Sequence, residues 1–344
     1  MIKPSNLSLM LAGLMAGAAF PAVADLVVLQ YHHVSDSTPP STSTTVSLFE
    51  DQLDMIEELG LEVVPLEHGT RQALAGELDN KQQIAITFDD AYDSVYHTAA
   101  ALLEEKGFPY TVFVNTDGIG GKGYMTWDQL EEFRDDELVT IANHSKDHDH
   151  MVQRPEEDTE AWRERTRINL DGAQKVLKEK LGTDVPMFAY PYGEFSQAVE
   201  SMLDDRGWYG YGQQSGAVGS HSHQTRMPRF PMADAYGQLD NLKPKLTSKA
   251  FPVDAEQLPD GVMSKNPPTL SFPLPDSMDA NRLTCFASGK GRVDFSVDSD
   301  RQLTLTAPGS FNSRRFRYNC TYPAGNGSFY WLSQQWLDLS KAED

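Results

Sequence analysis

The chain has 344 residues, of which 50 are Asp or Glu and 29 are Lys or Arg, so its formal net charge is −21. This acidity excludes nucleic acid and anionic lipid as partners, because phosphate binding needs clustered Lys and Arg side chains. It is typical of a soluble exported protein whose partner is neutral or cationic, or of acidity that serves solubility alone. The length allows one large domain, or one domain with a smaller one beside it.

The first residues have the pattern of a cleaved export signal. Lys3 precedes an apolar stretch that ends in the small residues 22–24. We therefore expect an export signal over residues 1–24, a mature chain that begins at Asp25, and a location in the periplasm or outside the cell. A membrane anchor is the alternative, but the apolar stretch is short and Gly-rich, and no basic flank follows it. No later stretch is apolar enough to predict a membrane span.

Residues 25–240 alternate between short apolar runs and amphipathic stretches. The apolar runs have the length and composition of strands that are buried on both faces, as in a parallel sheet. Several of the helical stretches between them end at a Gly, a common helix stop. This alternation predicts an α/β domain with a parallel sheet, either open or closed into a barrel. The predicted strands cover residues 26–30, 62–66, 84–88, 110–114, 138–142 and 187–191.

The character of the sequence changes near residue 240. A Pro-rich stretch, 241–280, is predicted to be a linker, and residues 281–344 are predicted to form a small all-β sandwich. The start of the sandwich is left open within residues 245–280. Here apolar residues alternate with polar ones, as in strands that bury one face. The only two cysteines, Cys285 and Cys320, share the inward phase of this alternation. In an exported protein such a pair usually forms a disulfide, and two buried free thiols are the alternative.

Polar and ionisable residues follow the carboxyl ends of four predicted strands. In a parallel α/β barrel these ends open onto one face, where active sites are built. We therefore expect these side chains to lie close together. They are Tyr31, His32 and His33 after the first strand, Asp89 and Asp90 after the third, Asn143, His144 and His148 after the fifth, and Tyr192 and Gly193 after the sixth.

Three of these residues, Asp90, His144 and His148, have the composition of a catalytic metal site. Two His and one Asp leave a position open for water, as catalytic zinc sites do. The two His are four residues apart, so that both can approach one ion, and a cation relieves the repulsion between Asp90 and the adjacent Asp89. Asp89 is then predicted to be the general base. Taken singly, the Asp pair is more often a helix cap and the His pair a surface feature.

At these residues the sequence resembles the polysaccharide deacetylases, carbohydrate esterase family 4, with their NodB-homology domain, over residues 26–235. The family's T-F-D-D motif stands at residues 87–90 and its H-S/T-x-x-H motif at 144–148, and residues 190–193 approximate its third motif. The resemblance implies a distorted (β/α) barrel.

The resemblance also implies a role for each matching residue. Asp89 would be the base, and the backbone N–H of Tyr192 would help to hold the oxyanion. Asp90, His144 and His148 would bind one divalent metal ion, which we expect to be zinc, with Co²⁺ and Ni²⁺ as alternatives.

This sequence departs from the family's pattern in two places, the third motif and the last motif. The third motif often carries an Arg two residues before its Pro, where this chain has Ala189. The late Leu-x-His, whose His protonates the leaving amine, has no match, and only His221 and His223 are available there. However, "LQYHHV" at 29–34 resembles the start of the poly-N-acetylglucosamine deacetylases, whose motifs are circularly permuted and whose acid is a His after an aromatic residue. This resemblance implies that His32 is the general acid.

The combined pattern predicts an exported, metal-dependent hydrolase that removes N-acetyl groups from an amino-sugar polysaccharide, such as poly-N-acetylglucosamine, a chitin-like polymer or the glycan of peptidoglycan. One alternative is an O-deacetylase of a polymer such as acetyl-xylan, and another is a non-catalytic carbohydrate-binding envelope protein. The expected partner is an acetylated polysaccharide, and the oligomeric state is left open. Three aromatic residues are candidates for stacking on sugar rings or, equally, for core packing: Trp208, Tyr209 and Tyr211.

Overall fold

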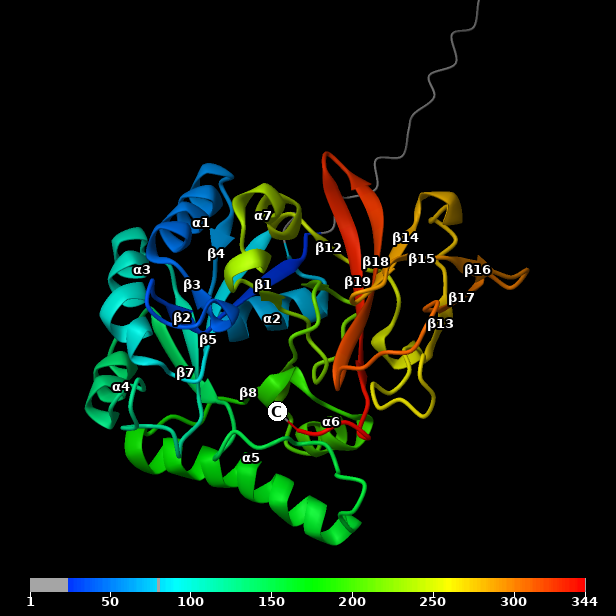
Figure 1. Cartoon of the computed structure of the whole chain (residues 1–344). Helices are drawn as coiled ribbons and strands as arrows, with labels where there is room; N and C mark the ends of the chain where they lie inside the picture. The colour runs from blue at the N-terminus through cyan, green and yellow to red at the C-terminus, as the bar shows by residue number, and fades with distance from the viewer. Residues whose placement is uncertain (1–23, 79–80, 344) are drawn as a thin grey trace, which may run out of the picture.

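The computed structural model describes residues 24–78 and 81–343. Apart from Ala24, the predicted export signal lies outside these residues. Within the described ranges, no helix combines the length and the apolarity that crossing a membrane requires. The chain forms an α/β region followed by a β-rich region with two mostly antiparallel sheets (Figure 1).

The α/β region is built on a nine-stranded sheet whose central strands are parallel and follow the order β1-β5-β6-β7-β8-β9. Strands β1, β5 and β6 at its centre are buried along their whole length, because both faces of the sheet are covered. The sheet curls into a partial barrel (Figure 1), so the predicted α/β barrel fold is confirmed. The strands are β1 (Leu26–Tyr31), β4 (Glu62–Val63), β5 (Gln83–Asp89), β6 (Tyr110–Val114), β7 (Val139–Asn143), β8 (Met187–Ala189), β9 (Tyr209–Tyr211), β10 (Ala217–Val218) and β11 (Phe230–Pro231).

Strand β9 was not among the predicted strands, and it decides the role of one aromatic residue. Tyr211 is completely buried, and its hydroxyl lies 2.8 Å from the Thr70 hydroxyl. It is therefore a core residue and not a platform for sugar rings.

Local signals explain where the helices begin and end. Helix α4 begins with a capping box, in which the Thr126 side chain accepts from the Gln129 N–H and the Gln129 side chain bonds back. The Asp158 carboxylate caps the long helix α5, which ends at Gly182 in the left-handed conformation. The helices are α1 (Val46–Glu58), α2 (Leu66–Ala75), α3 (Ala100–Lys106), α4 (Trp127–Arg134), α5 (Thr159–Leu181), α6 (Gln197–Asp204) and α7 (Leu239–Leu246).

The β-rich region (residues 249–337) contains a five-stranded and a three-stranded sheet that share one apolar core. The first has the order β12-β19-β18-β14-β15 and the second β13-β17-β16. The stretch predicted as a linker, 241–280, includes β12 and β13, which pair with β19 and β17; the domain boundaries stay a prediction. The strands are β12 (Lys249–Ala250), β13 (Thr269–Pro273), β14 (Thr284–Ala287), β15 (Gly291–Val293), β16 (Phe295–Val297), β17 (Gln302–Thr306), β18 (Arg315–Gly325) and β19 (Ser328–Leu337).

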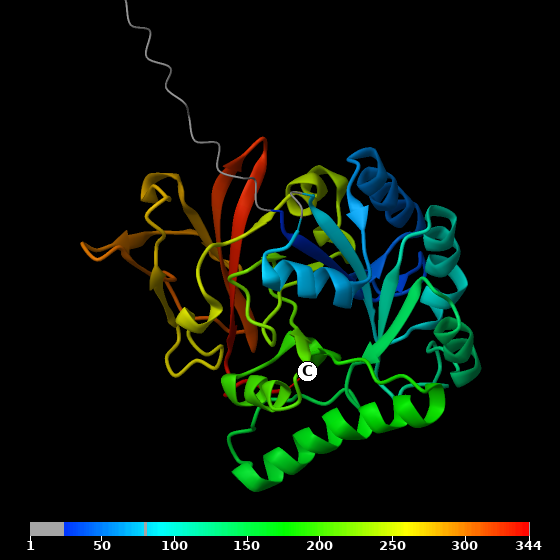
Figure 2. The same ribbon diagram turned by 180° about the vertical axis from the view of Figure 1, so that it is seen from behind.

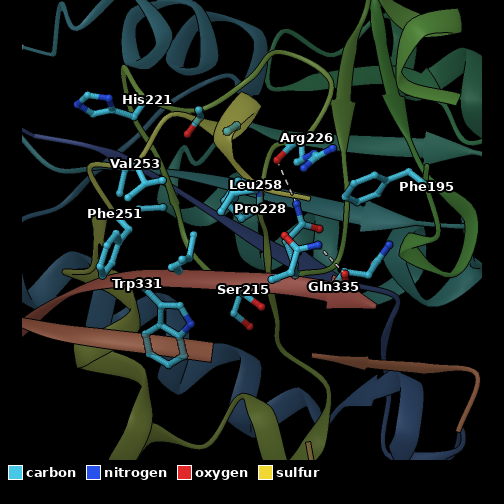
Figure 3. A pocket seen from close by; sticks show the side chains of 18 residues that line it. Phe195, Ser215, His221, Arg226, Pro228, Phe251, Val253, Leu258, Trp331 and Gln335 are labelled. Carbon is cyan, nitrogen blue, oxygen red and sulfur yellow. Dashed lines mark hydrogen bonds between the residues drawn. The ribbon is translucent and has the colours of Figure 1, made fainter. Parts of the chain in front are cut away.

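The β-rich region stands beside the barrel in both views (Figures 1 and 2). Trp331 of β19 packs edge-on against Phe230 of the barrel, with 5.2 Å between the ring centroids. A cavity of about 60 Å³ at this contact is lined by side chains of both regions, including Phe195, Arg226 and Gln335 (Figure 3). The two regions are therefore in direct side-chain contact.

A disulfide joins Cys285 of β14 to Cys320 of β18, which are directly opposite in the ladder. Both sulfurs lie in the apolar core of the β-rich region. We expect intact-mass analysis after alkylation without reductant to find no free thiol, and two labelled cysteines would contradict the bridge. Closing this loop should stabilise the region by about 3–4 kcal/mol in the chain-entropy model, measured as the loss of unfolding free energy on reduction.

Candidate active site

The candidate metal ligands converge as predicted. One ligand atom each from Asp90, His144 and His148 lies within 4.8 Å of the other two. The Asp90 Oδ1 atom is 3.6 Å from His144 Nε2 and 3.3 Å from His148 Nε2. Asp90 and His144 are buried, and His148 is partly exposed, so the group is open to solvent on one side.

The hydrogen bonds around these three residues orient their side chains so that lone pairs face a possible cation. His144 Nδ1 is 2.8 Å from the Ala189 carbonyl oxygen, which can only accept, so Nδ1 carries the proton and Nε2 keeps its lone pair toward Asp90. The Asn115 side-chain amide donates to Asp90 Oδ1 at 3.0 Å. Burial, followed by the nearby His144, lowers the pKa of His148 to about 4, which keeps its imidazole neutral. A neutral-imidazole and carboxylate donor set of this kind fits a divalent ion such as zinc.

The turn between the two His is held by side chains as well as by the backbone. The Asn143 side chain accepts from the Ser145 N–H at 2.8 Å, and the Ser145 hydroxyl accepts from the His148 N–H at 3.0 Å. Asn143 in turn donates to the Leu170 carbonyl oxygen of α5. The sequence spacing alone shows that both His can reach one ion, and this turn explains how they do so.

Backbone strain is concentrated at the site. Among the described residues, seven that are not glycine have a positive φ, and five of them belong to the site. Such conformations cost about 1–3 kcal/mol each and persist only where the surroundings enforce them, which is typical of functional sites. The five are Asp90 (φ 74°), Ala91 (57°), Ser145 (71°), His148 (58°) and Tyr192 (58°).

Asp89, the predicted base, is completely buried and held by an arginine that the sequence analysis did not identify. Arg229 Nη1 and Nη2 donate to the two Asp89 carboxylate oxygens at 2.7 and 2.8 Å, and the Gln30 amide donates at 2.7 Å. Burial by itself would raise the pKa of Asp89, but the Arg229 guanidinium outweighs it and holds the pKa below its ordinary value. Asp89 is therefore ionised at neutral pH.

Arg229 occupies a position that could have been noticed in the sequence. It is the one charged residue in the apolar run "MPRFPM", and its side chain is completely buried. A lone cation in a buried segment needs an anionic partner. The sequence does not show that this partner is Asp89, 140 residues earlier.

His32, the predicted acid, follows β1 directly and lines a cavity of about 380 Å³ together with Tyr192. It is close enough to Asp89 and to His148 to lower the pKa of both. The adjacent His33 has a packing role, because its ring stacks on Tyr92 at a centroid distance of 3.7 Å.

The alternative histidines lie elsewhere. His221 Nδ1 is 2.7 Å from an Asp254 carboxylate oxygen, and His221 lines the cavity between the barrel and the β-rich region (Figure 3). His223 lines a different surface pocket beside Thr225. The structure therefore brings His32, but neither alternative, to the cavity that Tyr192 lines.

Tyr192 connects the site to the β-rich region. Its ring stacks on His150 at 4.0 Å and meets His148 edge-on at 4.6 Å. The buried Glu194 accepts from His150 at 2.8 Å and, bidentately, from Arg314 at 2.8 and 3.0 Å. A residue of the β-rich region thus fixes the turn that carries Tyr192.

Replacing Glu194 with Gln should destabilise the protein by about 3–5 kcal/mol at pH 7, because the buried Arg314 would lose the nearer of its two anionic partners, Glu194 and Glu343. Burial raises the pKa of Glu194, but hydrogen bonds from His150 and Arg314 outweigh it and lower the pKa to about 2. A lowered pKa contributes stability that is complete above the unfolded value of 4.5 and is lost as the pH falls toward 2.

Urea unfolding at a series of pH values between 7 and 3 would measure both effects. The Gln variant should lose part of the acid dependence, whereas the exposed Glu131→Gln should behave as the wild type. Equal unfolding free energies for the Glu194 variant and the wild type would contradict this role.

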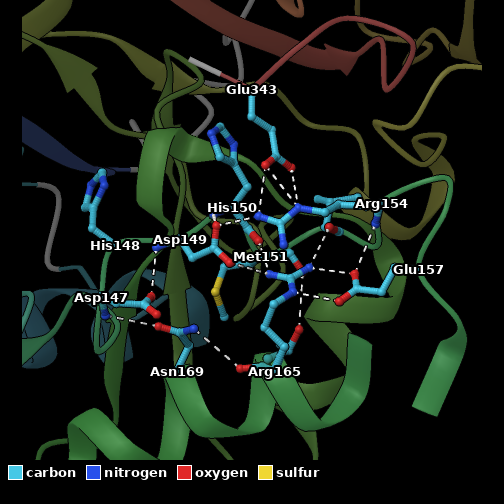
Figure 4. Close-up of polar contacts among 12 residues, drawn as sticks. Asp147, His148, Asp149, His150, Met151, Arg154, Glu157, Arg165, Asn169 and Glu343 are labelled. Carbon is cyan, nitrogen blue, oxygen red and sulfur yellow. Dashed lines mark hydrogen bonds and ion pairs between the residues drawn. The ribbon is translucent and has the colours of Figure 1, made fainter. Parts of the chain in front are cut away.

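The loop after His148 is fixed by ion pairs (Figure 4). The Asp149 carboxylate contacts Arg154 at 2.7 Å and Arg165 at 3.0 Å. Arg154 also pairs with Glu343 at 2.9 Å, so the C-terminal end of the described chain is tied to this loop. We interpret this cluster as support for the position of His148.

Comparisons with known proteins find similarities in the barrel region. Residues 77–210 match the family model described as polysaccharide deacetylase. A poly-beta-1,6-N-acetyl-D-glucosamine N-deacetylase of Staphylococcus aureus is 23% identical over 211 residues, or 59% of this chain and 72% of that protein. The Bacillus subtilis protein YxkH is 20% identical over 54% of this chain, and the match covers 63% of YxkH, less than two thirds of its length.

The solved structure of IcaB from Ammonifex degensii has the same fold in the barrel region. It is 24% identical with a TM-score of 0.55, over 64% of this chain and 94% of IcaB. Residues 77–210 are therefore similar to the polysaccharide deacetylases, and the barrel region has the fold of IcaB.

Proposed function

We propose that this protein is an exported, metal-dependent enzyme that removes N-acetyl groups from an amino-sugar polysaccharide of the poly-N-acetylglucosamine type. The observation that carries the proposal is the convergence of Asp90, His144 and His148 beside the carboxylate of Asp89. The similarity to a poly-beta-1,6-N-acetyl-D-glucosamine N-deacetylase supports an amide as the bond that is cleaved. Export is supported by the disulfide, which is typical of oxidising compartments.

The reaction needs one base and one acid. A divalent ion held by Asp90, His144 and His148 would supply Lewis acidity to the acetamide carbonyl and to a water. Asp89 takes the proton of the attacking water, because its ionised carboxylate is held in place by Arg229. The acetyl carbon gains the water oxygen and the C–N bond breaks.

The acid and the oxyanion donor come from other strand ends. His32 donates a proton to the leaving sugar nitrogen, which is a poor leaving group unless it is protonated. The backbone N–H of Tyr192 would donate to the carbonyl oxygen as negative charge develops on it. The products are acetate and a polymer with a free amine.

Acetate release from purified protein tests this function. Poly-N-acetylglucosamine and chitooligosaccharides should release acetate faster than acetyl-xylan, which carries O-acetyl groups. Faster release from acetyl-xylan would favour an O-deacetylase. No release from any of these polymers, with metal bound in stoichiometric amount, would favour a non-catalytic binding protein.

A further inference from the structure

We propose that Arg317 of the β-rich region is a substrate-binding residue that recognises an anionic group, such as a uronic or lactyl carboxylate, on the acetylated glycan. This inference rests on the proposed deacetylase function and extends its substrates from neutral poly-N-acetylglucosamine to acetylated glycans that also carry carboxylates. Residues 77–210 contain the family match, so Arg317 lies outside it.

The alternation of β18 directs Arg317 toward the barrel. Phe316 and Tyr318 are buried in the core of the β-rich region, and side chains along a strand point to alternate faces. Arg315 and Arg317 therefore share the opposite face. Both line the cavity that also contains His32 and Tyr192.

The backbone of Arg317 is held firmly in this position. Its N–H donates to the Ser288 hydroxyl at 2.9 Å, and its carbonyl accepts from the Ser288 N–H at 3.0 Å. On the other side, Arg317 is paired in the ladder with Gln335, which lines the same cavity. The guanidinium is thus presented by a rigid strand.

Two cationic side chains line this cavity although the protein as a whole is strongly acidic. They are Arg315 and Arg317, in a chain whose formal net charge is −21. Arg315 is compensated by Glu194, whose Oε1 lies 2.9 Å from Arg315 Nη1. After burial, the influences on the pKa of Arg317 are the Tyr236 side chain, which raises it, and the Arg315 guanidinium, which lowers it.

Burial is the main cause that lowers the pKa of Arg317 to about 10, so the site is costly for a cation that still carries its charge at neutral pH. A bound carboxylate would relieve this cost and accept two parallel N–H bonds from the guanidinium.

Tyr236 lines the same cavity and is exposed. Its ring is suited to stacking on a sugar ring, whether that sugar is neutral or charged.

Two matched substrates and three variants test the proposal. We compare a neutral chitooligosaccharide with an acidic oligosaccharide in which N-acetylglucosamine alternates with glucuronic acid. Arg317→Gln should lower kcat/KM and binding affinity for the acidic oligosaccharide by about 10- to 100-fold and leave the neutral one unchanged. Arg317→Lys should restore part of the loss. Tyr236→Ala should weaken the binding of both oligosaccharides to the same degree. Arg292→Gln, at an exposed position of β15, should leave the binding of both unchanged.

Binding is also measured by titration calorimetry on the metal-loaded protein, so that it does not depend on turnover. Equal losses for both oligosaccharides in Arg317→Gln, or no loss for either, would overturn the proposal. If Arg317→Gln lost affinity for the acidic oligosaccharide alone, but the wild type released no acetate, the role of Arg317 would stand and the deacetylase function would be contradicted.

Discussion

Replacing His148 with Ala should remove the bound metal and lower acetate release by about three orders of magnitude or more, because metal Lewis acidity contributes several kcal/mol to such reactions. His148 is the best ligand to replace. Its side chain is 24% exposed, whereas that of His144 is 1% exposed and bonded to the Ala189 carbonyl oxygen. Loss of the His148 imidazole should therefore leave the core intact.

Elemental analysis and acetate release measure the two effects together. The wild type should hold one equivalent of zinc, and a chelator should abolish its activity until zinc, cobalt or nickel is added back. His148→Ala should hold much less metal. The exposed His97, which lies outside the ligand group, provides the control, since His97→Ala should keep both metal and activity. Unchanged metal content in His148→Ala would refute the assignment.

The sequence was informative about the site because the site obeys a local rule. Each predicted ligand follows a buried apolar strand, and parallel strands deliver such residues to one face. The structure places Asp90 after β5 and His144 after β7, as this rule requires. The barrel and the disulfide follow from equally local patterns, namely strand–helix alternation and the inward phase of two cysteines.

What the sequence left undetermined depends on contacts between distant segments. Arg229 reaches Asp89 across 140 residues, and Arg314 reaches Glu194 across 120. Neither distance appears in any periodicity or motif. The same reason hid the contribution of β18 to the cavity, because its alternation predicts two faces but does not say what the outer face meets. A region expected to be a separate sandwich is, in the structure, one wall of the cavity that holds His32.

Replacing His32 with Ala should lower the turnover of an N-acetylated oligosaccharide by about two to four orders of magnitude, the usual range for a general acid, while metal content and fold are kept. The amine must be protonated as it leaves, and Asp89, held ionised by Arg229, is a poor proton donor. His221 and His223 line other cavities, so Ala substitutions there should have small effects.

A change of leaving group separates an acid from a residue that only shapes the site. An aryl acetate releases a phenolate, which leaves without being protonated, so it needs the base and the metal but not the acid. His32→Ala should therefore hydrolyse an aryl acetate at close to the wild-type rate although it fails on the acetamide. Asp89→Asn should fail on both substrates. Equal losses on the amide and the aryl ester in His32→Ala would show that His32 supports the geometry of the site and is not the acid. If His221 or His223 proved essential instead, that His would be the general acid.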